Sequence, residues 1–240
     1  MPFTFSHPAA VLPLAYLPKK YVCMTGLVAG SLAPDFEYFL GITMRSEHSH
    51  SVGGIFWFCL PVGLLLCFIF HDIIRNSFID NLPLFLKKRY YNAKKFNWNR
   101  YFVKHWFVAI LSVLAGAGSH LLWDYFTHGQ YSAYQLPSTV VGGLIVCFAV
   151  FITPKSEWVA GRVDWRYWLV FLVLAAAIAY IRFPSGWQGF EVGQIRFLSE
   201  WRGRAHDIGA VVVCALSACF VSITATSLIW SFRRRRKRAE

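Results

Sequence analysis

The sequence predicts an all-α fold, a polytopic integral membrane helical bundle, and its composition and charge spacing support this class. The 240 residues are 56% hydrophobic and 18% aromatic and only 15% charged, which is more apolar surface than a water-soluble domain can bury. Charged residues also leave long apolar intervals whose length suits helices that cross a bilayer. We therefore expect about five transmembrane helices preceded by an N-terminal interfacial helical hairpin.

Charge-free intervals locate the expected spans, because a charged side chain at the bilayer centre is costly. A helix needs about 20 apolar residues to cross the hydrocarbon core. Five intervals reach or approach this length. They lie between Glu47 and Asp72, Lys104 and Asp124, Asp124 and Lys155, Arg166 and Arg182, and Asp207 and Arg233.

The N-terminal region does not fit a single span. Lys19 and Lys20 follow Pro18 and divide the apolar residues between Pro8 and Pro34 into two pieces that are too short to cross. We expect the two pieces to form the interfacial hairpin. The chain is then one integral membrane domain, residues 1–240, with the hairpin and His/Asp motifs in 1–53, core spans in 54–154, C-terminal spans in 155–232 and a basic cytoplasmic tail in 233–240.

The net charge of +12 comes from Lys and Arg residues that are concentrated in two patches. Eight of the 24 lie in residues 75–104, and six form residues 233–238. Such clusters stay on the cytoplasmic side, so the charge indicates topology and argues against a nucleic-acid partner. We expect a multi-pass protein of the bacterial inner (plasma) membrane with a cytoplasmic C-terminus, and no protein partner is indicated. Four Arg residues in 182–207 oppose this orientation, because five alternating crossings place that segment outside.

The six cysteines are scattered, lie mostly inside apolar runs and show no C-x-x-C spacing. This pattern indicates buried thiols and argues against a disulfide framework or a thiolate metal site. The chain opens without a basic region before an apolar core, so we expect no cleaved signal peptide.

The most informative motif is H-x-x-x-D-x-x-x-H at the end of the second expected span. His120, Asp124 and His128 are four residues apart, which places them near one face of a helix. Imidazole and carboxylate together form a ligand set that Zn, Mn or Fe accepts. A structural alternative is that His120 only bonds across helices while the other two are solvated. Ionisable residues at membrane depth are functional hypotheses by default, so we favour the metal site.

Small residues precede this motif on the same expected helix, and they would let a neighbouring helix approach closely. They are Ser112, Ala115, Gly116 and Ser119.

Three further clusters could supply ligands. His7 lies in a Ser-His-Pro start, Asp35 follows Pro34 at the end of an apolar piece, and His48 and His50 precede the first full span. Each also has an ordinary interpretation, as a turn residue, a helix-stop cap or a solvated loop. Their convergence is the stronger signal, because the predicted topology brings all of them to one membrane face. The expected metal ligands are His7, Asp35, His48, His50, His120 and Asp124. All of them except His48 should approach within metal-bridging reach of one another.

Four motifs occur in a specific order, in residues 2–9 (PFTFSHPA), 30–38 (GSLAPDFEY), 50–54 (HSVGG) and 119–128 (SHLLWDYFTH). Together they resemble a bacterial integral-membrane family, the domain of unknown function 4184. More distantly, they are similar to YdjM-like membrane-bound metal-dependent hydrolases and to zinc-dependent phospholipase C. This similarity implies a metal-dependent phosphoester hydrolase with ligands at His7, Asp35, His50, His120 and Asp124.

The leading hypothesis is therefore a hydrolase whose divalent metal, Zn in first place, activates water for attack on a phosphoester. The expected partners are the lipid bilayer and an anionic lipid or other phosphoester substrate. Glu37 or His128 could act as the catalytic general base, and Arg45 could attract an anionic head group. The rival hypothesis is a non-enzymatic small transporter or assembly factor in which the same residues form a proton relay or a polar network.

Overall fold

The computed structural model describes residues 4–41, 46, 48–127, 133–159, 161–182 and 208–239. Within these ranges every regular element is helical, which confirms the all-α prediction. Five helices are long and apolar enough to cross a membrane. They are Val52–Asn81, Trp98–Thr127, Gln135–Ile152, Trp165–Arg182 and Val211–Arg234, and each overlaps one of the charge-free intervals.

The regular elements in the described part of the chain are helical segments, several of them short. In chain order, the elements are η1 (Thr4–Ala10), η2 (Leu12–Tyr16), α1 (Met24–Leu32), η3 (Ala33–Asp35), α2 (Phe36–Gly41), α3 (Val52–Gly54), η4 (Ile55–Cys59), α4 (Leu60–Phe68), η5 (Ile69–Ile74), α5 (Arg75–Asn81), α6 (Leu84–Tyr90), η6 (Tyr91–Lys95), α7 (Trp98–Thr127), α8 (Gln135–Ile152), α9 (Trp165–Arg182) and α11 (Ile208–Ala239). The first expected span is built from several consecutive segments and runs without a break from α3 to α5. Its π-helical segment η4 lies just before Pro61, whose missing N–H interrupts the regular hydrogen-bond ladder.

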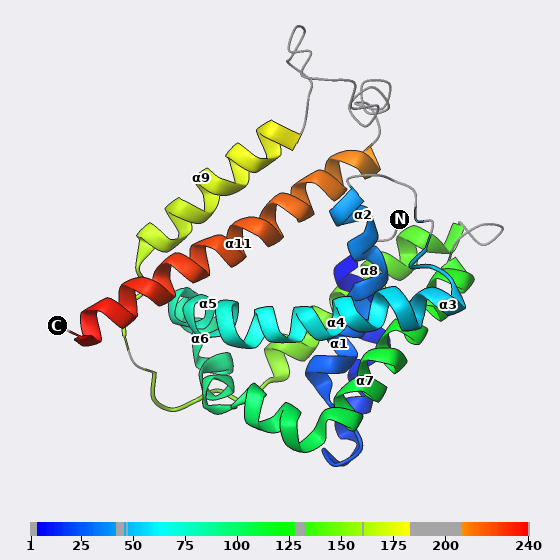
Figure 1. The fold of residues 1–240 in the computed structure, drawn as a ribbon, viewed down its shortest axis with the longest axis horizontal. Helices are drawn as coiled ribbons and strands as arrows, with labels where there is room; N and C mark the ends of the chain where they lie inside the picture. The colour runs from blue at the N-terminus through cyan, green and yellow to red at the C-terminus, as the bar shows by residue number, and fades with distance from the viewer. Residues whose placement is uncertain are drawn as a thin grey trace, which may run out of the picture. The chain divides into compact units, whose positions relative to one another are not determined.

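The described residues divide into two compact units. One lies within residues 1–37 and 46–163, and the other within residues 38–45 and 164–240. In the second unit, α9 and α11 pack side by side and run antiparallel (Figure 1). The hydroxyls of Tyr167 and Ser227 lie 2.8 Å apart between these two helices. The residues expected to bind metal all belong to the first unit.

The N-terminal region breaks where the sequence predicts. Lys19, Lys20 and Tyr21 form a turn in which the N–H of Tyr21 donates to the carbonyl of Pro18 at 2.9 Å. The piece before the turn forms the 3-10 helices η1 and η2, and the piece after it forms α1. Prolines in the first piece lack the N–H that a continuous α-helix needs, which explains the 3-10 form.

Close packing of α1 on α7 is the main helix contact of the first unit (Figure 1). A Cβ added at Gly30 would lie 2.1 Å from the carbonyl oxygen of Val113, and one at Gly116 would lie 2.2 Å from that of Leu27. The two backbones therefore approach closely only because both positions are glycine. The prediction of close approach at Gly116 is confirmed, and α1 is the neighbour.

All six cysteines are free, as expected, but their burial differs from the prediction. Cys147 in α8 and Cys219 in α11 are exposed, and the other four are buried. Both exposed thiols lie on apolar helices long enough to cross a membrane, so apolar surroundings in the sequence did not imply burial inside the protein.

Candidate metal centre

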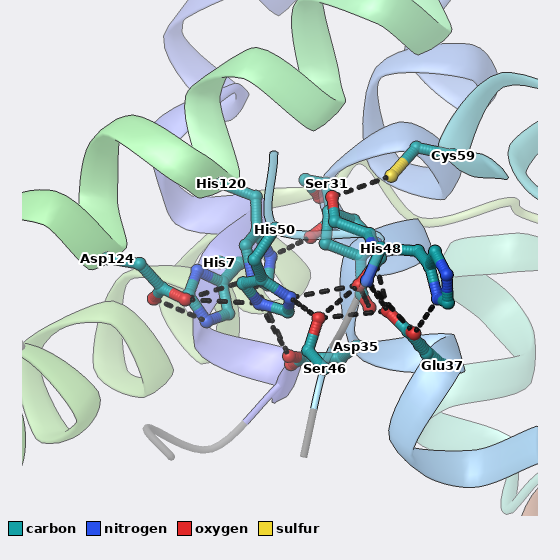
Figure 2. Close-up of polar contacts among 12 residues, drawn as sticks. His7, Ser31, Asp35, Glu37, Ser46, His48, His50, Cys59, His120 and Asp124 are labelled. Carbon is teal, nitrogen blue, oxygen red and sulfur yellow. Dashed lines mark hydrogen bonds and ion pairs between the residues drawn. The ribbon is translucent and has the colours of Figure 1, made fainter. Parts of the chain in front are cut away.

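Five side chains from separate parts of the first unit converge on one cluster (Figure 2). They are His7 from η1, Asp35 from η3, His50 from the segment before α3, and His120 and Asp124 from α7. One ligand atom each from His7, Asp35 and His120 lies within 4.8 Å of the others, and the same holds for His50, His120 and Asp124. His120 belongs to both groups, so it is the centre of the cluster.

The centre of the cluster is excluded from solvent. His7, Asp35 and His120 are 1%, 2% and 0% exposed. Nε2 of His120 lies 3.3 Å from Oδ2 of Asp124 and 3.5 Å from Oδ1 of Asp35. Nε2 of His50 lies 3.5 Å and 3.7 Å from carboxylate oxygens of the same two residues. The ring of His7 stacks on that of His120 with 3.7 Å between centroids.

The backbone of α1 fixes the orientation of His120. Nδ1 of His120 lies 2.7 Å from the carbonyl oxygen of Ser31. A carbonyl oxygen can only accept, so Nδ1 is the ring nitrogen that carries the proton. In the neutral ring, the lone pair is then on Nε2, which faces Asp35 and Asp124. A backbone carbonyl that holds the second ring nitrogen is the usual support of a metal-binding imidazole.

The residues present fit a metal ion. Among the residues that the structure describes, Nε2 of His120 and Oδ2 of Asp35 are buried without a hydrogen-bond partner. Such an atom typically costs about 1–3 kcal/mol. Burial also raises the pKa of the Asp35 carboxyl, and the nearby imidazoles only partly oppose this effect. A cation held by both atoms would remove the cost and stabilise the carboxylate.

Glu37 lies beside the cluster and not within either group. Its Oε2 accepts hydrogen bonds from Oγ of Ser46 at 2.9 Å and from the backbone N–H of Ser49 at 2.6 Å. Burial opposes ionisation of this carboxyl, but the hydrogen bonds from Ser49, Ser46 and His48 outweigh it and lower its pKa to about 2. Glu37 is therefore a carboxylate at neutral pH. Its role as a general base stays a prediction.

His48 also lies outside both groups. Its side chain is 54% exposed, and Nδ1 lies 3.2 Å from Oε1 of Glu37. The ring meets Trp57 edge-on at 5.2 Å between centroids. His48 thus faces away from His50 and toward Glu37 and Trp57. The other predicted residues, His128 and Arg45, lie outside the described residues.

We expect a His48→Ala variant to bind metal as the wild type does, because His48 contributes no atom to either group. Metal titration of the purified variant by isothermal calorimetry would check this expectation. A loss of affinity comparable to that of a His50→Ala variant would instead restore His48 to the ligand set.

Sequence reasoning missed three residues that support the cluster. The carbonyl of Ser31 holds His120, and the hydroxyls of Ser46 and Ser49 lie 2.8 Å and 2.9 Å from Nδ1 of His50. The serines that flank His48 and His50 were the available signal. A backbone carbonyl on a different helix leaves no signal in the sequence.

The fold and the cluster define a class, a helical protein with segments long and apolar enough to cross a membrane and with a buried His/Asp site. The chain belongs to the family described as domain of unknown function (DUF4184), whose model matches residues 1–132. These residues include all five converging side chains. The resemblance to this family is thereby confirmed, whereas the similarity to metal-dependent hydrolases stays a prediction. No curated protein and no solved structure is significantly similar to the chain.

Proposed function

We propose that the cluster binds a divalent metal ion, with Zn²⁺ as the expected ion, and that the protein is a metal-dependent phosphoester hydrolase. The observation that carries the proposal is the pair of three-residue groups that share buried His120. Three imidazoles and two carboxylates form a donor set that suits Zn²⁺. The distant similarity of the four sequence motifs to metal-dependent hydrolases supports the reaction class.

The shared imidazole limits the number of ions. Nδ1 of His120 is engaged with Ser31, so only the lone pair on Nε2 can coordinate. One lone pair holds one ion. The two three-residue groups therefore cannot each hold an ion through His120 at the same time, and we expect one ion per chain.

The residues of the chain have separate tasks in this reaction. A bound ion would lower the pKa of a water molecule and stabilise charge on phosphoryl oxygens. Asp35 and Asp124 would neutralise the positive charge of the ion inside the protein. Nε2 of His120 lies 3.5 Å and 3.3 Å from their carboxylate oxygens, so all three side chains can reach one ion. Asp35 and His7 form the buried side of the cluster, while His50 is partly exposed and marks the side from which a substrate enters.

We also propose a place for the protein in the cell, the bacterial inner membrane with a cytoplasmic C-terminus. The basic residues 75–104 and 233–238 support this orientation. A site at the end of α7 then meets the bilayer surface, where an anionic lipid or another phosphoester is the expected substrate.

Metal analysis of detergent-purified protein tests the proposal. We expect about one Zn²⁺ per chain by inductively coupled plasma mass spectrometry, because His120 offers one lone pair. Hydrolysis of bis(p-nitrophenyl) phosphate should stop after chelation and return when Zn²⁺ is added back.

Each outcome of this experiment has a distinct meaning. Two ions per chain would contradict the expected stoichiometry, and no ion would contradict the metal site itself. Stoichiometric metal without hydrolysis of any phosphoester tested would contradict the hydrolase and favour a non-enzymatic membrane protein.

A further inference from the structure

Two serine hydroxyls next to His50 each lie within hydrogen-bond distance of an oxygen that can only accept, and their own oxygens lie 2.9 Å apart. Oγ of Ser46 donates to Oε2 of Glu37 at 2.9 Å (Figure 2). Oγ of Ser49 donates to the carbonyl oxygen of Pro34 at 2.8 Å. A hydroxyl has one proton to donate. The two hydroxyls therefore have two protons between them, and Glu37 and Pro34 are the acceptors that cannot donate in return.

A third group beside both hydroxyls is the ring of His50. Its Nδ1 lies 2.8 Å from Oγ of Ser46 and 2.9 Å from Oγ of Ser49. A proton on Nδ1 serves these two contacts while both hydroxyls keep their acceptors, whereas an Nε2–H ring would take a hydroxyl proton away from Glu37 or Pro34. Nδ1 is therefore assigned as the donor. The neutral ring then carries its lone pair on Nε2, which faces Asp124 at 3.5 Å and Asp35 at 3.7 Å. His120 shows the same arrangement, with Nδ1 on the carbonyl of Ser31.

We propose that Glu37 is a positioning residue that sets the tautomer of His50 through the hydroxyl of Ser46. Glu37 takes the Ser46 proton, so the hydroxyl accepts from Nδ1, and Nε2 is presented to the cluster. The Glu37 carboxylate acts on His50 only through Ser46, and it belongs to neither three-residue group. This role differs from general-base catalysis, which requires direct contact with the reacting water.

The consequence for metal binding rests on the proposed function, whereas the tautomer itself does not. A histidine ligand needs its lone pair on the nitrogen that faces the ion. Loss of the hydrogen-bond partner that holds the other ring nitrogen typically costs 10–100-fold in metal affinity. The two properties can therefore be measured separately.

The tautomer is measured on metal-free, full-length protein labelled with ¹⁵N-histidine in detergent. Long-range ¹H–¹⁵N spectra show which ring nitrogen carries the proton, and a His50→Gln variant assigns the signal. We expect the Nδ1–H form in the wild type. In Glu37→Ala the Ser46 proton is released toward Nδ1, so the Nε2–H form should become populated.

Two further variants separate positioning from other roles. Glu37→Gln should keep the wild-type tautomer, because the short bond from the N–H of Ser49 holds the amide oxygen where it still accepts from Ser46. Ser51→Ala is the matched control from the same segment, because Ser51 bonds to the carbonyl of His48 and the N–H of Gly54. It should also leave the tautomer unchanged.

Zn²⁺ affinity provides the second readout. We expect Glu37→Ala to bind Zn²⁺ about 10–100-fold more weakly than the wild type, and Glu37→Gln and Ser51→Ala to bind it equally well. Should Glu37→Ala not fold, a Ser46→Ala, Ser49→Ala double variant tests the same path, because it removes both acceptors of the Nδ1 proton.

Three results would overturn the positioning role: an Nε2–H form of His50 in the wild type, an unchanged tautomer in the folded Glu37→Ala or double variant, or a Glu37→Gln variant that behaves like Glu37→Ala. If the tautomer changes as expected but the protein binds no Zn²⁺, the positioning role is supported and only the proposed function is contradicted.

Discussion

A His120→Ala variant should lose metal binding altogether. Both three-residue groups contain His120, so its removal leaves two ligands in each. The loss should exceed about 100-fold in affinity, because removing only a hydrogen-bond partner of a ligand already reaches that size. Isothermal titration with Zn²⁺, together with metal analysis of the purified variant, measures it.

The control for this variant is His105→Ala on the same helix. His105 lies at a kink of α7, with φ −130° and ψ 30°, and contacts the ring of Tyr101. It contributes to neither group, so metal binding should be retained. Thermal unfolding without metal shows whether each variant folds. A folded His120→Ala protein with stoichiometric, tightly held metal would refute the site.

The second large effect is expected from one added methyl group, in Gly116→Ala. The new Cβ would lie 2.2 Å from the carbonyl oxygen of Leu27 and 2.8 Å from the backbone nitrogen of Ser31. Backbone atoms cannot move aside as a side chain can, so α1 must shift away from α7. We expect a loss of about 3 kcal/mol or more in the free energy of unfolding. Because the shift moves the carbonyl of Ser31, metal affinity should fall as well.

Gly118→Ala is the matched control, two residues along the same helix. A Cβ at Gly118 meets nothing within 4 Å among the described residues. Alanine should therefore stabilise the helix by up to about 1 kcal/mol, since glycine is the weaker helix former. Denaturant titrations of both variants in the same detergent give the comparison. Equal stabilities would show that the α1–α7 contact is looser than the structure describes.

Local patterns in the sequence determined the fold class and part of the site. Apolar intervals between charges predicted the five long helices, because the bilayer requirement acts on each segment by itself. The spacing of His120 and Asp124 placed both on one helix face, because helix geometry is fixed over four residues. The convergence of His7, Asp35 and His50 on them followed from the expected topology.

The tertiary structure decided which of two neighbouring imidazoles joins the cluster. His48 and His50 have the same chemistry and lie two residues apart, yet only His50 faces Asp35 and Asp124. The difference arises from hydrogen bonds to Glu37, Ser46 and Ser49, whose directions depend on how the segment folds against Pro34 and Glu37.

The division of the chain into two units was likewise not readable from hydropathy. The hydrogen bond between Nδ1 of His120 and the carbonyl of Ser31 was also not readable from hydropathy. It depends on two glycines that let α1 and α7 approach closely. Hydropathy and helical periodicity are properties of one segment. The direction of a hydrogen bond and the contact between two helices depend on two segments at once, so only the folded chain fixes them.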